Sequence, residues 1–222
     1  MKKPVVDYRA FQLRKINQPE FSHLKLLIGW IGYFALYFIT ERFIPQEICY
    51  SVHCRLDDII PFCEVFIIPY VFWYFLVAGS LLYFALYNID SFKKLMTYII
   101  VTQVIAMAVY IIFPNRQDLR PELFPRENLL TKCVAFLYSF DTNTNVCPSL
   151  HVGYSLGIAS VWLKTKDVSR GVKAFVLISV ILVCLSVAFI KQHSVVDIFA
   201  AFPMCFLAEI IAFHLPKHKK TA

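Results

Sequence analysis

The sequence predicts an all-α, polytopic membrane protein with six transmembrane helices in a single domain and both termini in the cytoplasm. Of its 222 residues, 59% are hydrophobic and only 17% are charged, whereas soluble domains carry about 25% charged residues. The apolar residues gather in six blocks, and a membrane-spanning helix needs roughly 17–25 such residues. A soluble fold would require six helices apolar on every face, although soluble helices are normally apolar along one stripe.

The predicted spans, in chain order, are Leu24–Ile44, Cys63–Tyr87, Leu95–Phe113, Ser149–Leu163, Ala174–Ile190 and Val195–Leu215. The fourth is short and needs residues from its flanks to cross a bilayer. Residues 1–23 are polar and basic, and no small-residue cleavage site follows the first block, so we expect a retained span rather than a signal peptide. The chain is thus divided into a cytoplasmic segment 1–23, a six-helix bundle 24–215 and a basic cytoplasmic tail 216–222.

The formal charge of +7 indicates an orientation in the membrane. Fifteen of the 22 Lys and Arg residues lie in or next to the terminal segments and the short inner loops Asn88–Lys94 and Lys164–Lys173. An excess of basic residues on the cytoplasmic side is the usual pattern of membrane proteins. We therefore expect a plasma-membrane protein whose partners are membrane lipids and not nucleic acid. The sequence leaves the oligomeric state open.

Two longer segments, Pro45–Phe62 and Pro114–Cys147, are expected on the outer side. Within the second, Asn128 can cap a helix over Leu129–Phe140, whose rise of about 18 Å is too short to cross the hydrocarbon. This helix is expected to lie in the interface as a lid. The outer cysteines allow two disulfides or free thiols, and the sequence does not decide between them: the pairs are Cys49–Cys54 and Cys133–Cys147.

Small residues recur in the fourth predicted span. Gly153 and Gly157 form a GxxxG pair, a spacing that lets helices approach closely in lipid. Chance glycines in an apolar run would look the same. If the pair packs closely, the start of this span is held in a fixed position.

Three polar clusters lie at predicted outer boundaries of the membrane. They are Pro114–Pro121 (PNRQDLRP), Cys147–His151 (CPSLH) and Lys191–Asp197 (KQHSVVD). Successive spans alternate in direction, so the ends of spans three and five and the start of span four emerge on one side. We expect the three clusters to meet there.

The third and second clusters contain groups suited to nucleophilic and acid catalysis. His193 and Asp197 are four residues apart, which on a helix puts them on one face, so the carboxylate can orient the imidazole. Alone, this pair would also fit a boundary ion pair. Pro148 suits the first turn of a helix, and the backbone N–H groups of Ser149, Leu150 and His151 would then form an anion site. His151 could protonate a leaving oxygen.

The first cluster supplies positive charge. Arg116 and Arg120 are permanently protonated donors that match phosphate oxygens, although a single arginine at a lipid boundary often reaches only headgroups. Two arginines, a helix start and an oriented histidine on one side together indicate phosphoryl transfer. The chain has no His, Cys and carboxylate set with metal-ligand spacing, so neither a metal nor another cofactor is expected.

Four other acidic residues have weaker assignments. Glu64, near the outer end of the second span, is a candidate to face the site, and Glu209 is expected to face the bundle interior. Asp57 and Asp58 are expected to be solvated loop charges, with contact to a polar headgroup as the alternative.

The order RP, PSxH and HxxxD on alternating spans resembles the type-2 phosphatidic acid phosphatase superfamily, which also includes vanadium haloperoxidases. The resemblance covers residues 113–197 and the six-span layout. It implies that His193 becomes a phosphohistidine, that Asp197 orients it and that His151 is the general acid. It also implies that Arg120, Ser149 and neighbouring basic groups hold the phosphate without a metal.

Three positions depart from the family pattern. Phe113 stands where the first motif has a lysine, so Arg116 would have to substitute, and Leu150 stands in the glycine place of the second motif. Val187 replaces the arginine of the third motif, and Lys191, one helical turn nearer the histidine, is expected to supply that charge. The Pro-Ser-Leu-His form is similar to the branch that contains inositol phosphorylceramide synthase.

The sequence therefore predicts a lipid phosphate phosphatase whose site faces the outer leaflet and whose substrate is a diacylglycerol phosphate or an isoprenoid diphosphate. A phosphotransferase that passes the phospho-headgroup to a lipid alcohol is the alternative within enzymes, because water and alcohol compete for the same phosphoenzyme. A non-catalytic membrane transporter or binding protein is the alternative of another class.

Overall fold

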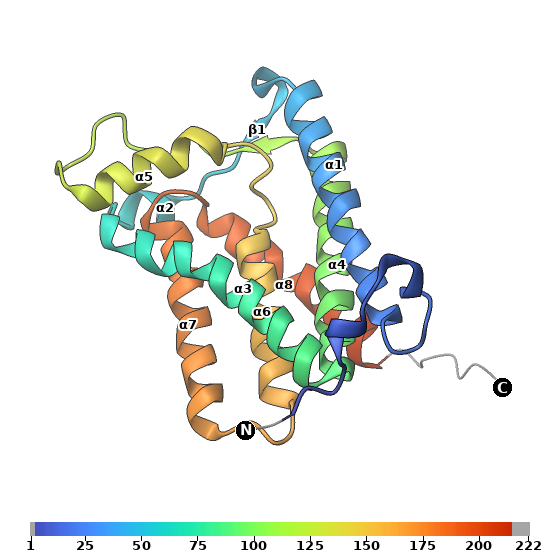
Figure 1. Ribbon diagram of the computed structural model, residues 1–222. Coiled ribbons are helices and arrows are strands. Elements are labelled where there is room, and N and C mark those ends of the chain that lie inside the picture. The colour runs from blue at the N-terminus through green and yellow to red at the C-terminus, as the bar shows by residue number, and fades with distance from the viewer. Residues whose placement is uncertain (1–2, 215–222) are drawn as a thin grey trace.

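The fold is a bundle of long helices with a layer of short elements over one end. The computed structural model describes residues 3–214, so the tail predicted at 216–222 and the last residue of the sixth block lie outside the described residues. The helices are α1 Ile28–Phe43, α2 Arg55–Ile59, α3 Ile67–Tyr87, α4 Ile89–Ile112, α5 Leu129–Phe140, α6 Leu150–Lys164, α7 Arg170–Phe189 and α8 Val195–Glu209. Figure 1 shows α6 in the middle, with α7 on one side and α4 and α1 on the other.

Short helical turns extend several of these helices. The 3₁₀ turns are Tyr8–Ala10, Leu13–Lys15, Ser22–Leu27, Gln46–Ile48 and Glu64–Phe66, and a π turn follows α8 over Ile210–His214. With these extensions, five helices are long and apolar enough to cross a membrane: Ser22–Phe43, Glu64–Tyr87, Ile89–Ile112, Arg170–Phe189 and Val195–His214. The prediction of an all-α integral membrane protein with several spans is confirmed. The helix of the fourth predicted span, α6, has 15 residues and is not one of these five.

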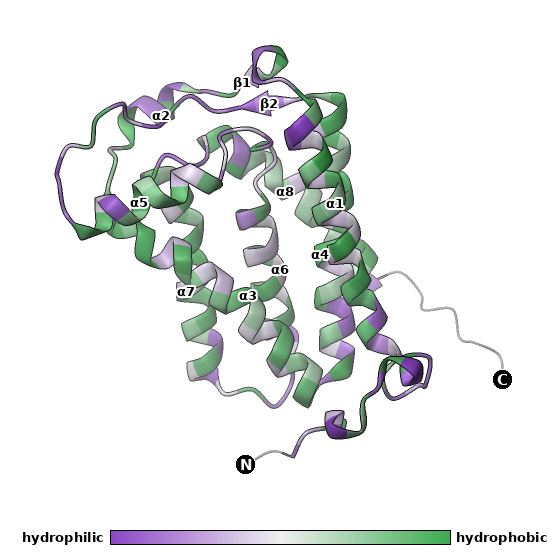
Figure 2. Ribbon diagram, turned by 45° about the horizontal axis from the view of Figure 1, so that its top comes forward, coloured by the Kyte–Doolittle hydropathy of each residue, from purple (hydrophilic) through white to green (hydrophobic). Residues whose placement is uncertain are grey.

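The helices of the bundle turn apolar side chains outward. Ile31, Phe38, Phe75 and Phe206 are each exposed over more than 60% of their surface, and Figure 2 shows green, hydrophobic ribbon along the long helices and purple mainly on the segments that join them. In water such a surface would be unfavourable, and large exposed apolar surfaces mark membrane contact. The outer surface is therefore suited to lipid on its long sides.

Helix α6 is the packing centre of the bundle. A Cβ atom on Gly157 would lie 2.5 Å from Cδ1 of Tyr98 on α4, and one on Gly153 would lie 2.9 Å from Cε of Met204 on α8. The Tyr98 ring leaves no room for a side chain at Gly157, whereas the flexible end of Met204 lies against Gly153, so the close approach expected from the GxxxG pair is confirmed. Since α6 is surrounded by other helices rather than lipid, its polar first turn can lie inside the bundle.

The connection between α3 and α4 is shorter than expected. The sequence predicted an inner loop over Asn88–Lys94, but Asn88 alone separates the two helices. Its N–H donates to the carbonyl of Phe84, and its side-chain oxygen accepts from the N–H of Ser91, so one residue ends α3 and caps α4. Capping by asparagine removes the need for a longer turn. The other inner connection, residues 165–169, is also shorter than predicted because α7 begins at Arg170.

The N-terminal segment folds against this connection. The N–H of Val5 donates to the carbonyl of Leu86, and the hydroxyl of Tyr8 donates to the carbonyl of Ala85. His23 is buried, and its Nε2 lies 2.7 Å from the Tyr8 hydroxyl. Since that hydroxyl donates to Ala85, it accepts from the histidine.

Two short strands, which the sequence did not predict, join the segments 45–62 and 114–147. Strand β1, Tyr50–Ser51, pairs in parallel with β2, Asn115–Arg116. Helix α5 has the predicted bounds, and the side chain of Asn128 caps it by accepting from the N–H of Thr131. Figure 1 shows α5 across the upper end of the bundle. All seven cysteines are free thiols, so neither possible disulfide is formed.

Candidate functional site

His193 lies in the tight turn between α7 and α8. The N–H groups of Gln192 and His193 both donate to the carbonyl of Val187, which fixes the turn. Nδ1 of His193 is 3.2 Å from Oδ2 of Asp197, and that oxygen also accepts from the N–H of Ser194 at 2.9 Å. The expected pairing of His193 and Asp197 is present, although His193 precedes the helix rather than lying on it. The carboxylate both caps α8 and orients the imidazole.

A second histidine lies next to the first. His151 is the second residue of α6, and its Nδ1 is 3.4 Å from Nε2 of His193. Its ring stands between the rings of Tyr70 and Trp73, with centroids 4.6 Å and 4.2 Å away. Because Asp197 accepts from Nδ1 of His193, the lone pair of Nε2 faces His151 and the open side of the site.

The start of α6 differs in one respect from the expectation. Ser149 is the N-cap, its hydroxyl accepting from the N–H of Val152, so Pro148 precedes the helix rather than lying in its first turn. The N–H of Ser149 is already used, because it donates to the carbonyl of Asp197 at 3.1 Å. Leu150 and His151 therefore supply the first-turn N–H groups beside the two histidines, where a helix end favours an anion.

Arg120 contacts the neighbour of His193 but does not line the cavity described below. One of its terminal nitrogens donates to the carbonyl of Tyr138, and the other donates to the carbonyl of Asp141 and to Oε1 of Gln192, the neighbour of His193. Its guanidinium stands 4.3 Å from the centre of the Tyr138 ring. Arg120 thus adds positive charge to the region through a residue adjacent to His193.

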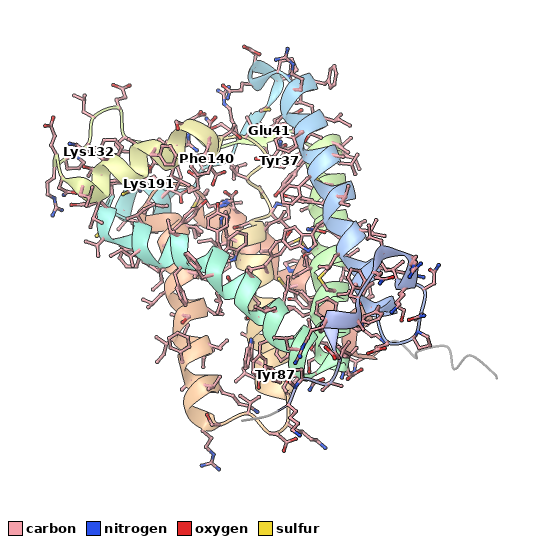
Figure 3. The ribbon with its side chains drawn as sticks, in the orientation of Figure 1. Tyr37, Glu41, Tyr87, Lys132, Phe140 and Lys191 are labelled. Carbon is pink, nitrogen blue, oxygen red and sulfur yellow. The ribbon has the colours of Figure 1, made fainter. Side chains whose placement is uncertain are left out.

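The other two predicted cations are placed elsewhere. Arg116 donates to the carbonyl of Gln46 and pairs with Asp118 on the outer strand layer. Lys191 has a positive φ of 55° and donates to the carbonyls of Asp57 and Ile60. Figure 3 shows Lys191 below α5, away from α1. Neither side chain lines the cavity described below.

Asp57 is a buried residue of this region, although the sequence predicted a solvated loop charge. Its carboxylate accepts from the Ser194 hydroxyl at 2.6 Å, from the N–H of Val195 at 2.8 Å and from the N–H of Cys54 at 2.8 Å. Its interpretation as a solvated charge is therefore wrong, whereas Asp58 is exposed beside His53. Burial raises the pKa of Asp57, but these hydrogen bonds outweigh burial and hold the pKa below its ordinary value.

The two acidic residues assigned to spans have different positions. Glu64 does not face the histidines, because its carboxylate accepts from Asn128 and lies 3.5 Å from Arg126 at the start of α5. Glu209 points toward α6, as expected, where it accepts from the hydroxyl of Ser160 and pairs with Lys164. Both stabilise helix contacts away from the two histidines.

A cavity of about 660 Å³ opens beside the histidines. It runs between α1, α3 and α6 and the segment 140–146, and its wall is rich in aromatic rings. Among the rings are Trp30, Tyr33, Tyr37, Trp73, Tyr74 and Tyr154. Figure 3 shows Tyr37 on the side of α1 that turns toward Phe140 at the end of α5. A mostly apolar cavity with a few polar groups at one end is typical of a small-molecule site.

Asp141 and Gln192 are further polar residues of this cavity, and the sequence did not predict either of them. Asp141 accepts from the hydroxyl of Tyr70 at 2.5 Å, a contact across 71 positions of the chain. Burial raises the pKa of Asp141, against the lowering effect of Tyr70, His193 and Arg120. No local motif marks either residue, although Gln192 could have been suspected as the neighbour of His193.

The chain matches no protein-family model, no curated protein and no solved structure.

Proposed function

We propose that this protein is a membrane-embedded lipid phosphate phosphatase that works through a phosphohistidine at His193. The observation that supports it is the row Asp197, His193 and His151, in which a carboxylate orients one imidazole and a second imidazole stands at its free nitrogen. This is the arrangement of an oriented nucleophile with an acid beside it. The aromatic cavity that ends at the same atoms has room for part of a lipid.

The reaction follows from the positions of these groups. Nε2 of His193 attacks phosphorus, a P–N bond forms and the P–O bond to the lipid breaks, while His151 gives a proton to the leaving lipid oxygen. Water then attacks the phosphohistidine, His151 takes a proton from it, the P–N bond breaks and inorganic phosphate leaves. The first turn of α6, with Leu150 and His151, and the charge of Arg120 would stabilise the phosphoryl oxygens.

The placement in the membrane completes the proposal. Six crossings, with α6 as the short central one, put both termini in the cytoplasm and His193 at the outer side of the plasma membrane. The basic residues near the opposite end of the bundle support this orientation. Because α6 is enclosed by neighbouring helices, 15 residues suffice for a crossing whose outer end is a recessed polar site.

The test is direct capture of the phosphoenzyme. Purified protein is incubated with phosphatidate, or with an isoprenoid diphosphate, labelled in the phosphate and is then quenched in base or in acid. We expect protein-bound label that is stable in base, labile in acid, present in Asp58→Asn and absent from His193→Ala. Activity is expected to persist in excess chelator. Release of labelled phosphate indicates hydrolysis, whereas label in a second lipid indicates transfer. Uptake of the substrate without any phosphoenzyme would contradict the proposed enzyme and support a transporter.

A further inference from the structure

The carboxylate of Asp141 has no part in the reaction described above, although it lines the same cavity as His193. It lies at the end of α5, where the chain turns down toward α6, and it accepts from the hydroxyl of Tyr70. Arg120 approaches only the backbone carbonyl of this residue. Burial raises the pKa of this carboxylate, and Tyr70, His193, Arg120 and Gln192 together lower it only in part. A cation that enters the cavity would favour the charged form of the carboxylate further.

The charged side chain that lines the cavity at this end is acidic, and Arg120 lies behind it without lining the cavity. Over residues 3–214, no lysine or arginine lines it, and Asp141 is its one acidic side chain. A second carboxylate lies close by, because Glu41 on α1 accepts from Thr144 and Asn145, which both line the cavity. Phosphate oxygens are favoured at the α6 end, where the helix terminus lies, but an anion would be repelled at the Asp141 end.

The aromatic rings around Asp141 suit a cation as well. Tyr33 and Tyr37 of α1 and Trp73 and Tyr74 of α3 line the cavity on its two sides. The faces of such rings attract ammonium groups, most strongly where water is excluded. Figure 3 shows Tyr37 and Glu41 on the same side of α1, facing the end of α5. Rings and carboxylate together form a cage for positive charge.

We infer that the cavity binds the ammonium group of an amine-bearing lipid phosphate, with Asp141 as its counter-ion and the tyrosines and tryptophan around it. The inference rests on the proposed function, which places the phosphorus at His193. The ammonium then stands within a few bonds of the phosphate. Two sources have this chemistry: a 2-aminoalkyl phosphate, whose amine is on the leaving alcohol, and a phosphoethanolamine lipid, whose amine is on the headgroup.

The experiment measures binding without turnover. His193→Ala protein in non-ionic micelles is titrated with a long-chain 2-aminoalkyl phosphate or with a lysophosphoethanolamine lipid, and each is compared with its N-acetyl and N-trimethyl derivatives. Fluorescence of Trp30 and Trp73, which line the cavity, reports binding. We expect the charged amine and trimethyl forms of one lipid to bind about 10-fold or more tightly than the neutral acetyl form. The lipid that shows this preference identifies the source of the amine.

Two further variants assign the preference to Asp141. Asp141→Asn keeps an oxygen for the Tyr70 hydroxyl and should reduce the preference to about 2-fold or less, whereas Asp58→Asn, an exposed carboxylate outside the cavity, should retain it. Equal binding of charged and neutral forms of both lipids would overturn the inference, even if Asp141→Asn failed to fold. If the charged forms bind more tightly but wild-type protein forms no phosphoenzyme, the catalytic proposal alone is rejected. If a phosphoenzyme forms but charged and neutral forms of both lipids bind equally, the ammonium site alone is rejected.

Discussion

The two histidines are held in different ways, and this difference fits the two roles proposed for them. His193 has a carboxylate on one ring nitrogen and an open lone pair on the other. His151 stands between two aromatic rings, and its Nε2 has no hydrogen-bond partner among residues 3–214. The arrangement at His193 favours attack on phosphorus by an oriented nitrogen. His151 stands beside that nitrogen and has no carboxylate of its own to orient it.

The roles predict opposite responses to the leaving group. A lipid alkoxide needs a proton as it leaves, whereas a nitrophenolate barely does. His151→Ala should therefore lose about 10²–10⁴-fold in kcat/KM on a lipid phosphate and recover most of that loss on 4-nitrophenyl phosphate. His193→Ala should be inactive on both, because it lacks the nucleophile. Turnover of the aryl substrate by purified His193→Ala would disprove the assignment of the nucleophile.

The residues of the site that could be predicted are those set by local sequence. His193, Asp197, His151 and Ser149 belong to short motifs whose members come together within one turn or one helix start, so their spacing was informative. Arg116 and Lys191 have long side chains whose direction depends on distant carbonyls, and spacing does not contain that information. Asp57 contacts residues 137 and 138 positions away, which no local pattern reveals.

At the scale of the element, α2 acts as an anchor for the start of α8. The carboxylate of Asp57 holds Ser194 and Val195, and Lys191 returns to the carbonyls of Asp57 and Ile60. The residues held by these contacts lie just before and just after His193 in the sequence. The position of the proposed nucleophile is therefore set by α2, a short helix of the segment 45–62.

Removal of this anchor should affect both stability and turnover. Asp57→Ala leaves buried donors unpaired and should lower the free energy of unfolding by about 2–4 kcal/mol, seen as a lower melting temperature in detergent, while Asp58→Ala changes little. Because hydrogen bonds lower the pKa of Asp57 from its ordinary 3.8, its stabilisation is complete above that value and is lost as pH falls through the lowered pKa. The gap between wild type and Asp57→Ala should close in acid. An undiminished gap at pH 2 would contradict this account.

The contact between α4 and α6 gives a test of helix packing with a matched control. Gly157→Ala places a methyl group 2.5 Å from the buried ring of Tyr98 and should destabilise the bundle by about 1–3 kcal/mol. Gly79→Ala, on α3, meets nothing within 4 Å and should be neutral or gain up to about 1 kcal/mol from helix propensity. Melting curves of the two variants decide the matter. Equal stability would mean that α6 does not depend on close approach at Gly157.

For the whole molecule, the sequence predicted the helical class and the approximate spans because long apolar blocks are a strong and local signal. The prediction was wrong where a single side chain sets the length of a connection. Asn88 ends α3 and caps α4, so one residue stands where a seven-residue loop was predicted. It also missed β1 and β2, which have two residues each and depend on pairing between distant segments. The N-terminal segment was predicted as a polar and basic cytoplasmic segment, and its composition did not reveal that Phe21 and His23 are buried.

The orientation of the whole molecule can be tested with thiol labelling in intact cells. In a Cys133→Ser background, which removes the exposed native thiol, Asp118→Cys should react with an impermeant maleimide from outside. Lys166→Cys, in the exposed connection 165–169, should react only after the membrane is opened. Labelling of Lys166→Cys in intact cells, with Asp118→Cys protected, would invert the proposed topology.

The one-residue link at Asn88 has a consequence for what the protein presents at the end opposite the histidines. The chain turns back there without a loop, so the corner between α3 and α4 offers little surface of its own. The N-terminal segment fills that corner through the bonds of Val5 and Tyr8 to Leu86 and Ala85. Anything that approaches this corner therefore meets residues 5–8, which form part of the surface there.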